Sequence, residues 1–399
     1  MIRSSAVGIG LIVTAAGALG GVGALLLVDG GADGGLAVAT STTTTTTSTT
    51  TTIPPRSATL LFTGDLLPHG PVVNAAARYA DQGWDFTPMY ERVRPIIEAA
   101  DVAICHMETP LSPDDTRISG YPAFNAPRAF AEALLEVGYD GCSTASNHAM
   151  DRGRDGVSAT IDVFSEIGLN QNGMARFVDE DWTPTLYEAG GIVIGHISAT
   201  YGLNGISLAA DEEFLVELID PEMILAEARA AREAGAEFVV VSLHWGVEYR
   251  HEPTTAQVDA LEAILPSPDV NLIVGHHAHV VQPIDTLMGE WVVFGLGNFL
   301  SNQSAACCAT AAQDGLMVEV ELIEPAAGII EVGSVRYTPT WVDRRDYTIL
   351  PVAAALADDE LADVHDELRR SWDRTVEVIE SQLDSADLSV SLEPPLVDG

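Results

Sequence analysis

Three histidines follow an apolar run in the segment LIVGHHAHVVQ, at positions 276, 277 and 279. Imidazoles this close together would repel one another if protonated and would leave lone pairs without partners if neutral. A divalent metal ion resolves both problems, because neutral imidazole is the commonest side-chain ligand for late divalent metals. Since residues two apart in an extended loop project to the same side, we expect His277 and His279 to bind metal and His276 to point away. The alternative is a plain polar loop, in which the three histidines are equivalent.

Four further segments carry polar side chains where an apolar run ends. Their candidate groups are Asp65 and His69 in LLFTGDLLPH, His106 and Glu108 in VAICHMETP, Asn147, His148 and Asp151 in STASNHAMDRG, and His244 and Glu248 in VVVSLHWGVEY. In open α/β sheets, ligands bind beyond the carboxyl ends of the strands, so these segments can converge in one crevice. Each residue alone has an ordinary explanation, such as a helix cap for Asp65 or a turn for Asn147. Together they match the ligands of a two-metal hydrolytic site.

Short β-branched runs alternate with amphipathic, alanine-rich stretches from Ala58 onward. Helical periodicity is present at 221–237 and 254–267, between apolar runs. The alternation predicts an α/β core with helices on both faces of the sheets, and the last two apolar runs predict a hairpin at one edge. We expect one main domain over residues 58–345, followed by a C-terminal helical extension and tail over 346–399.

The charge of the chain excludes several functions. It has 58 acidic and 19 basic side chains, a net charge of −39, and every basic residue is Arg. The absence of Lys from the sequence excludes Schiff-base catalysis, a lysine general base and a P-loop lysine. No basic patch could overcome this negative field at a nucleic-acid backbone, so nucleic acid is excluded as a partner. We interpret the acidic excess as a solvated surface.

The N-terminal segment 1–35 predicts export. It has a positive start at Arg3 and then 25 uncharged residues from Ser4 to Val28. This length is sufficient to span a bilayer, although cleavage after the AVAT sequence at 37–40 is the alternative. The Thr-rich tract that follows, within 36–57, predicts a disordered stalk. The expected location is therefore the cell membrane, as a single-pass protein with an extracytoplasmic domain, or the medium if the segment is cleaved.

The four cysteines do not form a disulfide scaffold at this chain length. Cys307 and Cys308 are adjacent, and we expect them not to pair with each other. Cys105 and Cys142 lie near the ends of apolar runs and are expected to be buried small hydrophobes. A bridge between the two pairs is the alternative in an oxidising compartment.

Six ordered motifs give the chain a family resemblance over roughly Ala58 to Asp343. They are GDLLPH, METPLS, SNHAMDRG, LHWGVEY with EPTTAQ, GHHAHVVQP and GLGNFLSNQ. This set resembles the capsule-synthesis CapA family, also called poly-γ-glutamate capsule proteins, which are similar to calcineurin-type metallophosphatases. The resemblance implies a layered α/β sandwich with central β-sheets flanked by helices.

The resemblance also implies roles for individual residues. The implied metal ligands are Asp65, Glu108, Asn147, His244, His277 and His279, with Glu108 in the place of a bridging carboxylate. His148 is the implied catalytic residue. The phosphatases have Asp-x-His in their first motif, whereas His69 lies four residues after Asp65, and His106 stands where the family often has Asn. Each of these two histidines is expected either to bind the metal or to form a hydrogen bond with a residue that binds it.

The expected chemistry is hydrolysis with two divalent metal ions about 3.5–4 Å apart, which lower the pKa of a shared water so that it becomes the nucleophile. Mn, Fe, Zn and Mg are all compatible with this expectation. His148 would donate a proton to the leaving oxygen or stabilise the developing charge. Arg152 or Arg154 would bind an anionic substrate through two hydrogen bonds, or would instead form a salt bridge with one of the many acids.

Two functions remain open from the sequence. The first is a membrane-anchored, extracytoplasmic metal-dependent hydrolase in capsule or surface-polymer biosynthesis, acting on a phosphoester or on a polymer such as poly-γ-glutamate. The second is a non-catalytic polymer-binding or scaffolding subunit that works with the membrane subunits of a capsule synthase. A nearly complete ligand set favours the enzyme. The net charge would repel polyglutamate, so binding of such a polymer needs the metal ions or a local arginine cluster.

Overall fold

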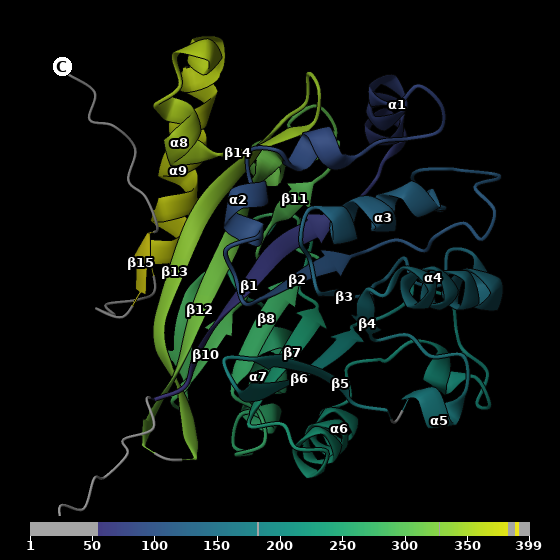
Figure 1. The fold of residues 1–399 in the computed structure, drawn as a ribbon, viewed down its shortest axis with the longest axis vertical. Helices are drawn as coiled ribbons and strands as arrows, with labels where there is room; N and C mark the ends of the chain where they lie inside the picture. Colours follow the sequence, from purple (N-terminus) through teal and green to yellow (C-terminus); the bar gives the residue numbers. More distant parts are fainter. Residues whose placement is uncertain (1–54, 182, 327, 382–387, 391–399) are drawn as a thin grey trace, which may run out of the picture. The chain divides into compact units, whose positions relative to one another are not determined.

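Two β-sheets pack face to face in the computed structural model, and helices cover their outer faces (Figure 1). The structure describes residues 55–181, 183–326, 328–381 and 388–390. The predicted export segment and the stalk up to residue 54 lie outside these described residues. Within them, no helix is both long enough and apolar enough to cross a membrane. The expected α/β sandwich with helices on the outside is the observed architecture.

The first sheet has the strand order β14-β13-β12-β1-β2-β3-β4, while β11 pairs with β1 and β15 pairs with β13. Its strands are β1 (Ser57–Leu66), β2 (Val102–Met107), β3 (Gly141–Ser143), β4 (Asn170–Asn172), β11 (Asn298–Leu300), β12 (Asp314–Ala326), β13 (Ile329–Asp343), β14 (Thr348–Pro351) and β15 (Leu388–Val390). Strands β1 to β4 are parallel, and β12 and β13 form the predicted antiparallel hairpin. The sequence predicts this hairpin at an edge of the sheet. That position is wrong, because β14 pairs with β13 on its outer side.

The second sheet has the strand order β5-β6-β7-β8-β10-β9. Its strands are β5 (Thr185–Ala189), β6 (Ile192–Thr200), β7 (Phe238–His244), β8 (Leu272–His276), β9 (Ile284–Leu287) and β10 (Glu290–Val293). The central strands β7 and β8 are buried along their whole length. This explains their continuous apolar sequences, because a strand covered on both faces has no polar side.

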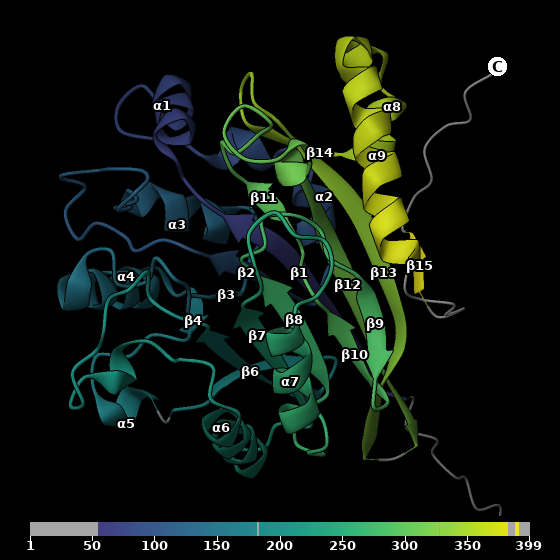
Figure 2. The same cartoon turned by 180° about the vertical axis from the view of Figure 1, so that it is seen from behind.

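Helices cover each sheet from outside (Figures 1 and 2). The α-helices are α1 (Gly70–Tyr79), α2 (Arg94–Ile97), α3 (Arg128–Glu136), α4 (Gly153–Ile167), α5 (Val178–Asp181), α6 (Pro221–Glu233), α7 (Thr255–Ile264), α8 (Val352–Leu356) and α9 (His365–Glu380), and the 3-10 helices are η1 (Thr87–Tyr90), η2 (Glu213–Leu215), η3 (Thr310–Gln313) and η4 (Asp359–Val364). Helices α1 and α3 pack on the first sheet, and α6 and α7 pack on the second. Helix α7 begins where the sequence predicts, because Thr254 and Gln257 form a reciprocal capping box.

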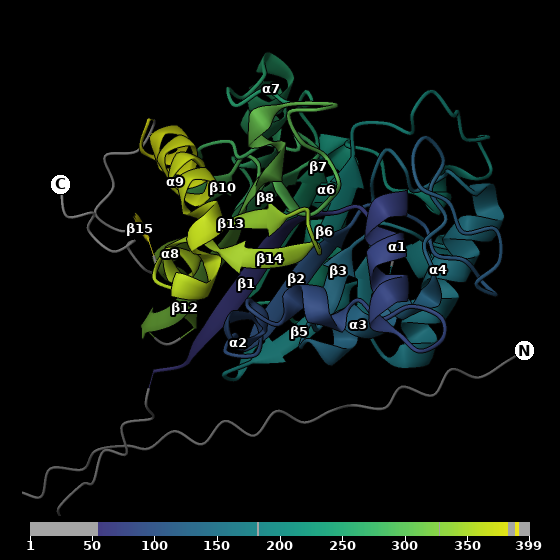
Figure 3. The ribbon, with the colours of Figure 1, turned by 90° about the horizontal axis from the view of Figure 1, so that it is seen from above.

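The C-terminal part of the described chain packs against the first sheet. Strand β14 pairs with β13, and Ile379 of α9 is fully buried in the core between the sheets. Arg374 of the same helix forms an ion pair with the buried Asp314 at 2.9 Å. Seen from above, α8 and α9 lie on the side of β13, away from α4 (Figure 3). The core between the sheets thus includes a residue from the segment expected to be an extension.

The cysteine pairing differs from the sequence prediction. Cys105 of β2 and Cys142 of β3 form a disulfide, and their strands place the two residues directly opposite each other. They are buried, as expected, but they are not free thiols. Cys307 and Cys308 also form a disulfide, so the expectation that neighbours in sequence would not pair is wrong. Each pair closes on itself, and the alternative of bridges between the two pairs is therefore wrong as well.

Candidate metal centre

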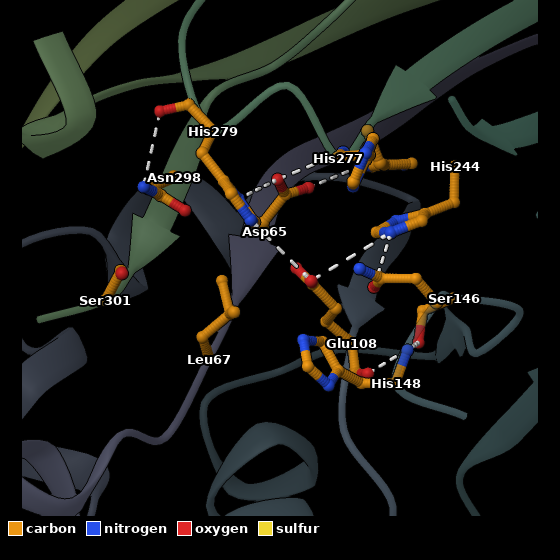
Figure 4. A network of polar contacts seen from close by, with 12 residues as sticks. Asp65, Leu67, Glu108, Ser146, His148, His244, His277, His279, Asn298 and Ser301 are labelled. Atoms are coloured by element: carbon orange, nitrogen blue, oxygen red, sulfur yellow. Dashed lines mark hydrogen bonds and ion pairs between the residues drawn. The ribbon is translucent and has the colours of Figure 1, made fainter. Parts of the chain in front are cut away.

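Strand register brings the candidate residues to one place. In the first sheet, Asp65 at the end of β1 lies opposite His106 of β2. In the second sheet, His244 and His276 are the last residues of β7 and β8 and lie opposite each other. The carboxyl ends of these parallel strands therefore meet, and Figure 4 shows the resulting cluster of imidazoles and carboxylates. Convergence at the strand ends is the arrangement expected from the sequence.

The loop after β8 turns back on itself within the histidine motif. His277 and His279 have φ values of +84° and +54°, in the left-handed region that few non-glycine residues adopt. This turn directs the backbone N–H of His277 to Asp65 Oδ2 at 3.1 Å. It also places His279 Nδ1 3.0 Å from the same oxygen. Strained backbone at two adjacent candidate ligands is typical of a functional site.

Glu108 lies just beyond the end of β2, in the middle of the cluster (Figure 4). Its side chain is fully buried, and neither carboxylate oxygen has a hydrogen-bond partner among the residues that the structure describes. Oε1 is 3.8 Å from His279 Nε2 and 3.9 Å from His244 Nε2. A buried carboxylate between imidazoles that do not reach it is poorly satisfied, and a cation between these groups would satisfy it.

Asn147 and His148 reach the cluster from the loop between β3 and α4. Asn147 Oδ1 lies 3.0 Å from His244 Nε2. The side chain of His148 contacts Asp151, with Nδ1 2.8 Å from Oδ2. The loop is fixed by Ser146, whose hydroxyl donates to the Glu108 carbonyl at 2.6 Å and accepts from the His148 N–H. The implied catalytic residue is therefore held in position by a carboxylate and by the backbone.

His276 lies within the cluster, so the expectation that it points away is wrong. Its Nδ1 is 3.3 Å from Asp65 Oδ1, and its ring stacks on His106 with centroids 4.0 Å apart. The alternation argument fails because His276 is the last residue of β8, and the left-handed turn begins only after it. His106 is also buried in the cluster, where its Nε2 lies 2.9 Å from His244 Nδ1.

Three other candidates have protein partners elsewhere. His69 Nδ1 lies 3.0 Å from the Leu67 carbonyl, and its ring packs edge-on against Phe124. Arg152 donates to Ser119 Oγ and to the Ala123 carbonyl. Arg154 forms an exposed ion pair with Glu212 at 2.8 Å, which is the alternative that the sequence left open. The structure brings none of these three into the ligand cluster.

Electrostatics in the cluster favour a cation. Burial acts to raise the pKa of Asp65, but the imidazoles of His276 and His279 outweigh it and lower this pKa below its usual range. Burial raises the pKa of Glu108 well above its usual range. Burial and neighbouring imidazoles lower the pKa of His244 well below its usual range, whereas the carboxylates of Glu108 and Asp65 overcome burial and raise the pKa of His279 to about 9. A divalent ion would stabilise both carboxylates together with neutral imidazoles.

The donor atoms fit a metal centre. Five buried atoms in the cluster lack a hydrogen-bond partner in the described part of the chain, and they are Asp65 Oδ1, both oxygens of Glu108, His276 Nδ1 and His277 Nδ1. Three groups have ligand atoms within 4.8 Å of one another: Asp65, His106 and His276; His106, Glu108 and His244; and Glu108, His277 and His279. Buried carboxylates are normally paired or bound to metal. The cluster is thus compatible with binding of divalent ions.

Several residues at the centre received no role from the sequence. Tyr201, half exposed, lies with its ring 4.5 Å from that of His277. Asn298 donates to the His279 carbonyl at 3.3 Å and to the Ala312 carbonyl at 2.8 Å. Tyr201 follows the end of β6, so the signal that found the other residues, a polar side chain after an apolar run, also applies to it. Asn298 lies inside one of the six motifs and could have been assigned from it.

The chain is similar to known proteins in sequence and in structure. The family model described as "Bacterial capsule synthesis protein PGA_cap" matches residues 59–303. The "Capsule biosynthesis protein CapA" of Bacillus anthracis is 25% identical over 281 residues, which cover 69% of this chain and 66% of that protein. The "PGA biosynthesis protein CapA" of Bacillus subtilis (strain 168) is 27% identical over 268 residues, which cover 66% of this chain and 67% of that protein. The matches thus span about two thirds of the length of these relatives.

A more distant structural likeness was also found. A calcineurin-like phosphoesterase from Bacillus subtilis superposes with a TM-score of 0.45 at 14% identity, covering 81% of this chain and 99% of that chain. A likeness at this level carries no conclusion about activity. The chemistry of the site rests on the residues themselves.

Proposed function

The chain belongs to the bacterial capsule synthesis protein family PGA_cap, and we propose that it acts in capsule or surface-polymer production as a metal-dependent hydrolase. We propose a location outside the cytoplasm, with the membrane as anchor, on the basis of the uncharged N-terminal segment. The polymer proposed is poly-γ-glutamate or a related surface polymer, because two relatives carry capsule or PGA biosynthesis in their names.

The observation that carries the hydrolase proposal is the buried ligand cluster. Six side chains of the implied ligand set lie together, and they are Asp65, Glu108, Asn147, His244, His277 and His279. When bound, two divalent ions supply Lewis acidity and lower the pKa of water toward neutrality. The protein's own contribution is to hold the ligands on strand ends and turns, so that the donor atoms need little rearrangement.

His148 is proposed to hold and donate a proton during hydrolysis. Asp151 accepts a hydrogen bond from Nδ1–H and is itself fixed by the backbone N–H of Phe124 at 2.7 Å. Among the described residues, Nε2 of His148 makes no hydrogen bond, so it is the nitrogen left to protonate a leaving oxygen. The carboxylate stabilises the imidazolium and sets its orientation.

Recognition of an anionic substrate is proposed to depend on the metal ions. The candidate arginines Arg152 and Arg154 are bound to protein partners. Four positive charges from two divalent ions would exceed the two negative charges of Asp65 and Glu108, so the loaded centre would attract one anionic group. The negative surface would repel a long polyanion. A phosphoester or a polymer end is therefore a better substrate than the interior of a polyglutamate chain.

Metal analysis of the purified full-length chain tests this proposal. We expect about two divalent ions per chain and hydrolysis of a phosphoester probe such as bis-p-nitrophenyl phosphate. His148→Ala should lower hydrolysis by about 10²–10⁴-fold while metal content stays unchanged. A well-folded chain that binds no divalent ion after reconstitution would refute the hydrolase.

An accessory role is the competing outcome of a cellular test. Asn147→Ala and His148→Ala should abolish or strongly reduce surface-polymer output in cells if hydrolysis is required. Unchanged output from both variants, at wild-type protein levels, would instead assign the chain to binding or organising the membrane subunits of a capsule synthase.

A further inference from the structure

We propose that His106 and His276 are metal ligands and that, with Asp65, they form one of the ion positions of the centre. This inference rests on the proposed metal centre and deepens it, because neither histidine belongs to the ligand set implied by the family motifs. Two further groups of donor atoms lie in the centre. Glu108, His277 and His279 share no residue with the first group, whereas the group of Glu108, His244 and His106 shares His106 with it.

Distances within the first group fit donors to one ion. His276 Nδ1 lies 3.3 Å from Asp65 Oδ1, and the donor atoms of the group, His106 included, lie within 4.8 Å of one another. Two ligand atoms about 2.1 Å from the same ion are about 3–3.4 Å apart when the angle between them is 90–109°. All three side chains are at least 97% buried, so water cannot easily replace an ion there.

An ion pair or hydrogen bond alone leaves this group unsatisfied. Within the described residues, His276 Nδ1 and Asp65 Oδ1 both lack a hydrogen-bond partner, although they lie 3.3 Å apart. An unsatisfied buried donor or acceptor costs about 1–3 kcal/mol. The other oxygen of Asp65 already accepts from the backbone N–H of His277 and contacts His279 Nδ1. Its Oδ1 is therefore the atom left for an ion beside His276.

The environment of His106 leaves a lone pair on its buried Nε2. The hydroxyl of Ser143 lies 3.3 Å from the Cys105 carbonyl, to which it can donate, and 2.8 Å from His106 Nδ1. When it donates to Cys105, it accepts from Nδ1–H of His106, and Nε2 then carries the lone pair. That nitrogen faces His244 Nδ1 at 2.9 Å. His244 Nδ1 either donates a hydrogen bond to this nitrogen or leaves its lone pair available to an ion.

The ligand set indicates which ions the centre prefers. Five imidazoles surround the two carboxylates, and they belong to His106, His244, His276, His277 and His279. Imidazole suits Zn²⁺, Fe²⁺ and Co²⁺, whereas Mg²⁺ prefers carboxylate, carbonyl and water oxygens. We therefore expect the full chain, stripped of metal by a chelator, to bind Zn²⁺ and Co²⁺ far more tightly than Mg²⁺.

Titration of the stripped full chain with Zn²⁺ and Co²⁺ tests the assignment. His106→Ala and His276→Ala should each bind about one ion fewer than the wild type, or bind one ion more than about 100-fold more weakly, while the Co²⁺ absorption changes in both. The control is His196→Ala, which removes another buried imidazole and should keep the wild-type metal content, because the hydrogen-bond partner of His196 among the described residues is Ser242 at 2.9 Å. Asn variants of His106 and His276 repeat the measurement if the Ala variants do not fold.

The outcomes separate this inference from the proposed function. Full metal content and unchanged affinity in folded variants of both His106 and His276 would overturn the inference and leave the hydrolase intact. A wild-type chain that binds no ion would overturn both. Loss of one ion from each variant, but not from the His196 control, would establish the position at Asp65.

Discussion

Two groups of acidic side chains in the described part of the chain have different neighbours. In the metal centre, Asp65 and Glu108 lie among histidines. In a second region, which we call the acidic pocket, Asp181, Glu217 and Glu227 line a cavity of about 400 Å³ at the edge strands β4 and β5. Imidazoles add lone pairs without adding negative charge, whereas carboxylates beside carboxylates add charge. The first arrangement suits a cation, and the second retains protons.

The ionisation of the two regions differs at Asp65. Imidazole neighbours overcome the effect of burial and lower the pKa of Asp65, whereas burial raises the pKa of Glu108 in the same centre. In the acidic pocket, burial and the charge of Glu217 raise the pKa of Glu227 to about 9, and burial together with Asp181 raises the pKa of Glu217 to about 7. Hydrogen bonding to Glu227 acts in the opposite direction on Glu217 and lowers its pKa. Carboxyl groups this close favour a state in which at least one of them is protonated.

The largest effect is expected from removing a histidine of the centre. His279→Ala should weaken binding of divalent ions by more than about 100-fold and should abolish hydrolysis of a phosphoester probe, because the imidazole faces both Asp65 and Glu108. Calorimetric titration with Zn²⁺ measures the affinity, and circular dichroism checks the fold. The matched control is again His196→Ala. Equal metal content in the wild type and His279→Ala would show that the histidine-rich centre does not bind metal through His279, which contradicts its proposed difference from the acidic pocket.

A smaller effect is expected from the carboxylate behind His148. Asp151→Asn keeps an oxygen for the backbone N–H of Phe124 but loses the charge that stabilises a protonated His148. We expect hydrolysis to fall by about 10–100-fold with metal content unchanged. Steady-state kinetics on the phosphoester probe, together with metal analysis, measures both. Loss of metal in this variant would contradict the proposed role of Asp151, which is to orient the proton donor His148 and not to support the metal ligands.

The acidic pocket should make stability depend on pH in a defined direction. Since the folded pKa of Glu227 is raised, its contribution to stability is fully present below pH 4.5 and is lost as pH rises through about 9. Glu227→Gln removes the ionisable group, so the variant should exceed the wild type in free energy of unfolding by about 1–3 kcal/mol at pH 8. The difference should shrink at pH 5.

Urea denaturation at both pH values measures this effect. Glu222→Gln, an exposed position on the same helix α6, is the control and should change stability by less than about 0.5 kcal/mol at either pH. A Glu227→Gln variant that is less stable than the wild type at pH 8 would show that the acidic pocket holds a cation rather than protons.

Much of the fold and part of the site follow from sequence patterns. The buried strands β7 and β8 are continuous apolar runs, and their ends carry His244 and His276 because polar residues in such a sheet are confined to strand ends. The same rule predicts that Asp65 and Glu108 come close to them. The spacing of apolar residues and the order of the strands can be read directly from the sequence, and they determine where these strands end.

Other features depend on contacts that no local pattern contains. The predicted direction of the His276 side chain is wrong, because the left-handed turn at His277 breaks the alternation of an extended chain. The partner of Arg154 is Glu212, 58 residues later in the sequence, and any of many acids could have taken that place. The acidic pocket was not predicted at all, since Glu217 and Glu227 lie on separate elements and resemble ordinary surface acids in the sequence.

The smallest effect is expected at Arg154, because this residue lies on the surface and not in either of the two regions compared above. Its guanidinium is about half exposed and forms an ion pair with Glu212 that is also exposed. Such pairs contribute about 0.2–1 kcal/mol, because solvent screens the charges and two long side chains lose rotamer freedom. Arg154→Ala should therefore change the free energy of unfolding by less than about 1 kcal/mol and leave KM for an anionic phosphoester within about twofold of the wild type. Urea denaturation and steady-state kinetics measure the two quantities. A tenfold rise in KM would restore Arg154 as a substrate-binding residue, and it would mean that the arginine leaves Glu212 when substrate binds.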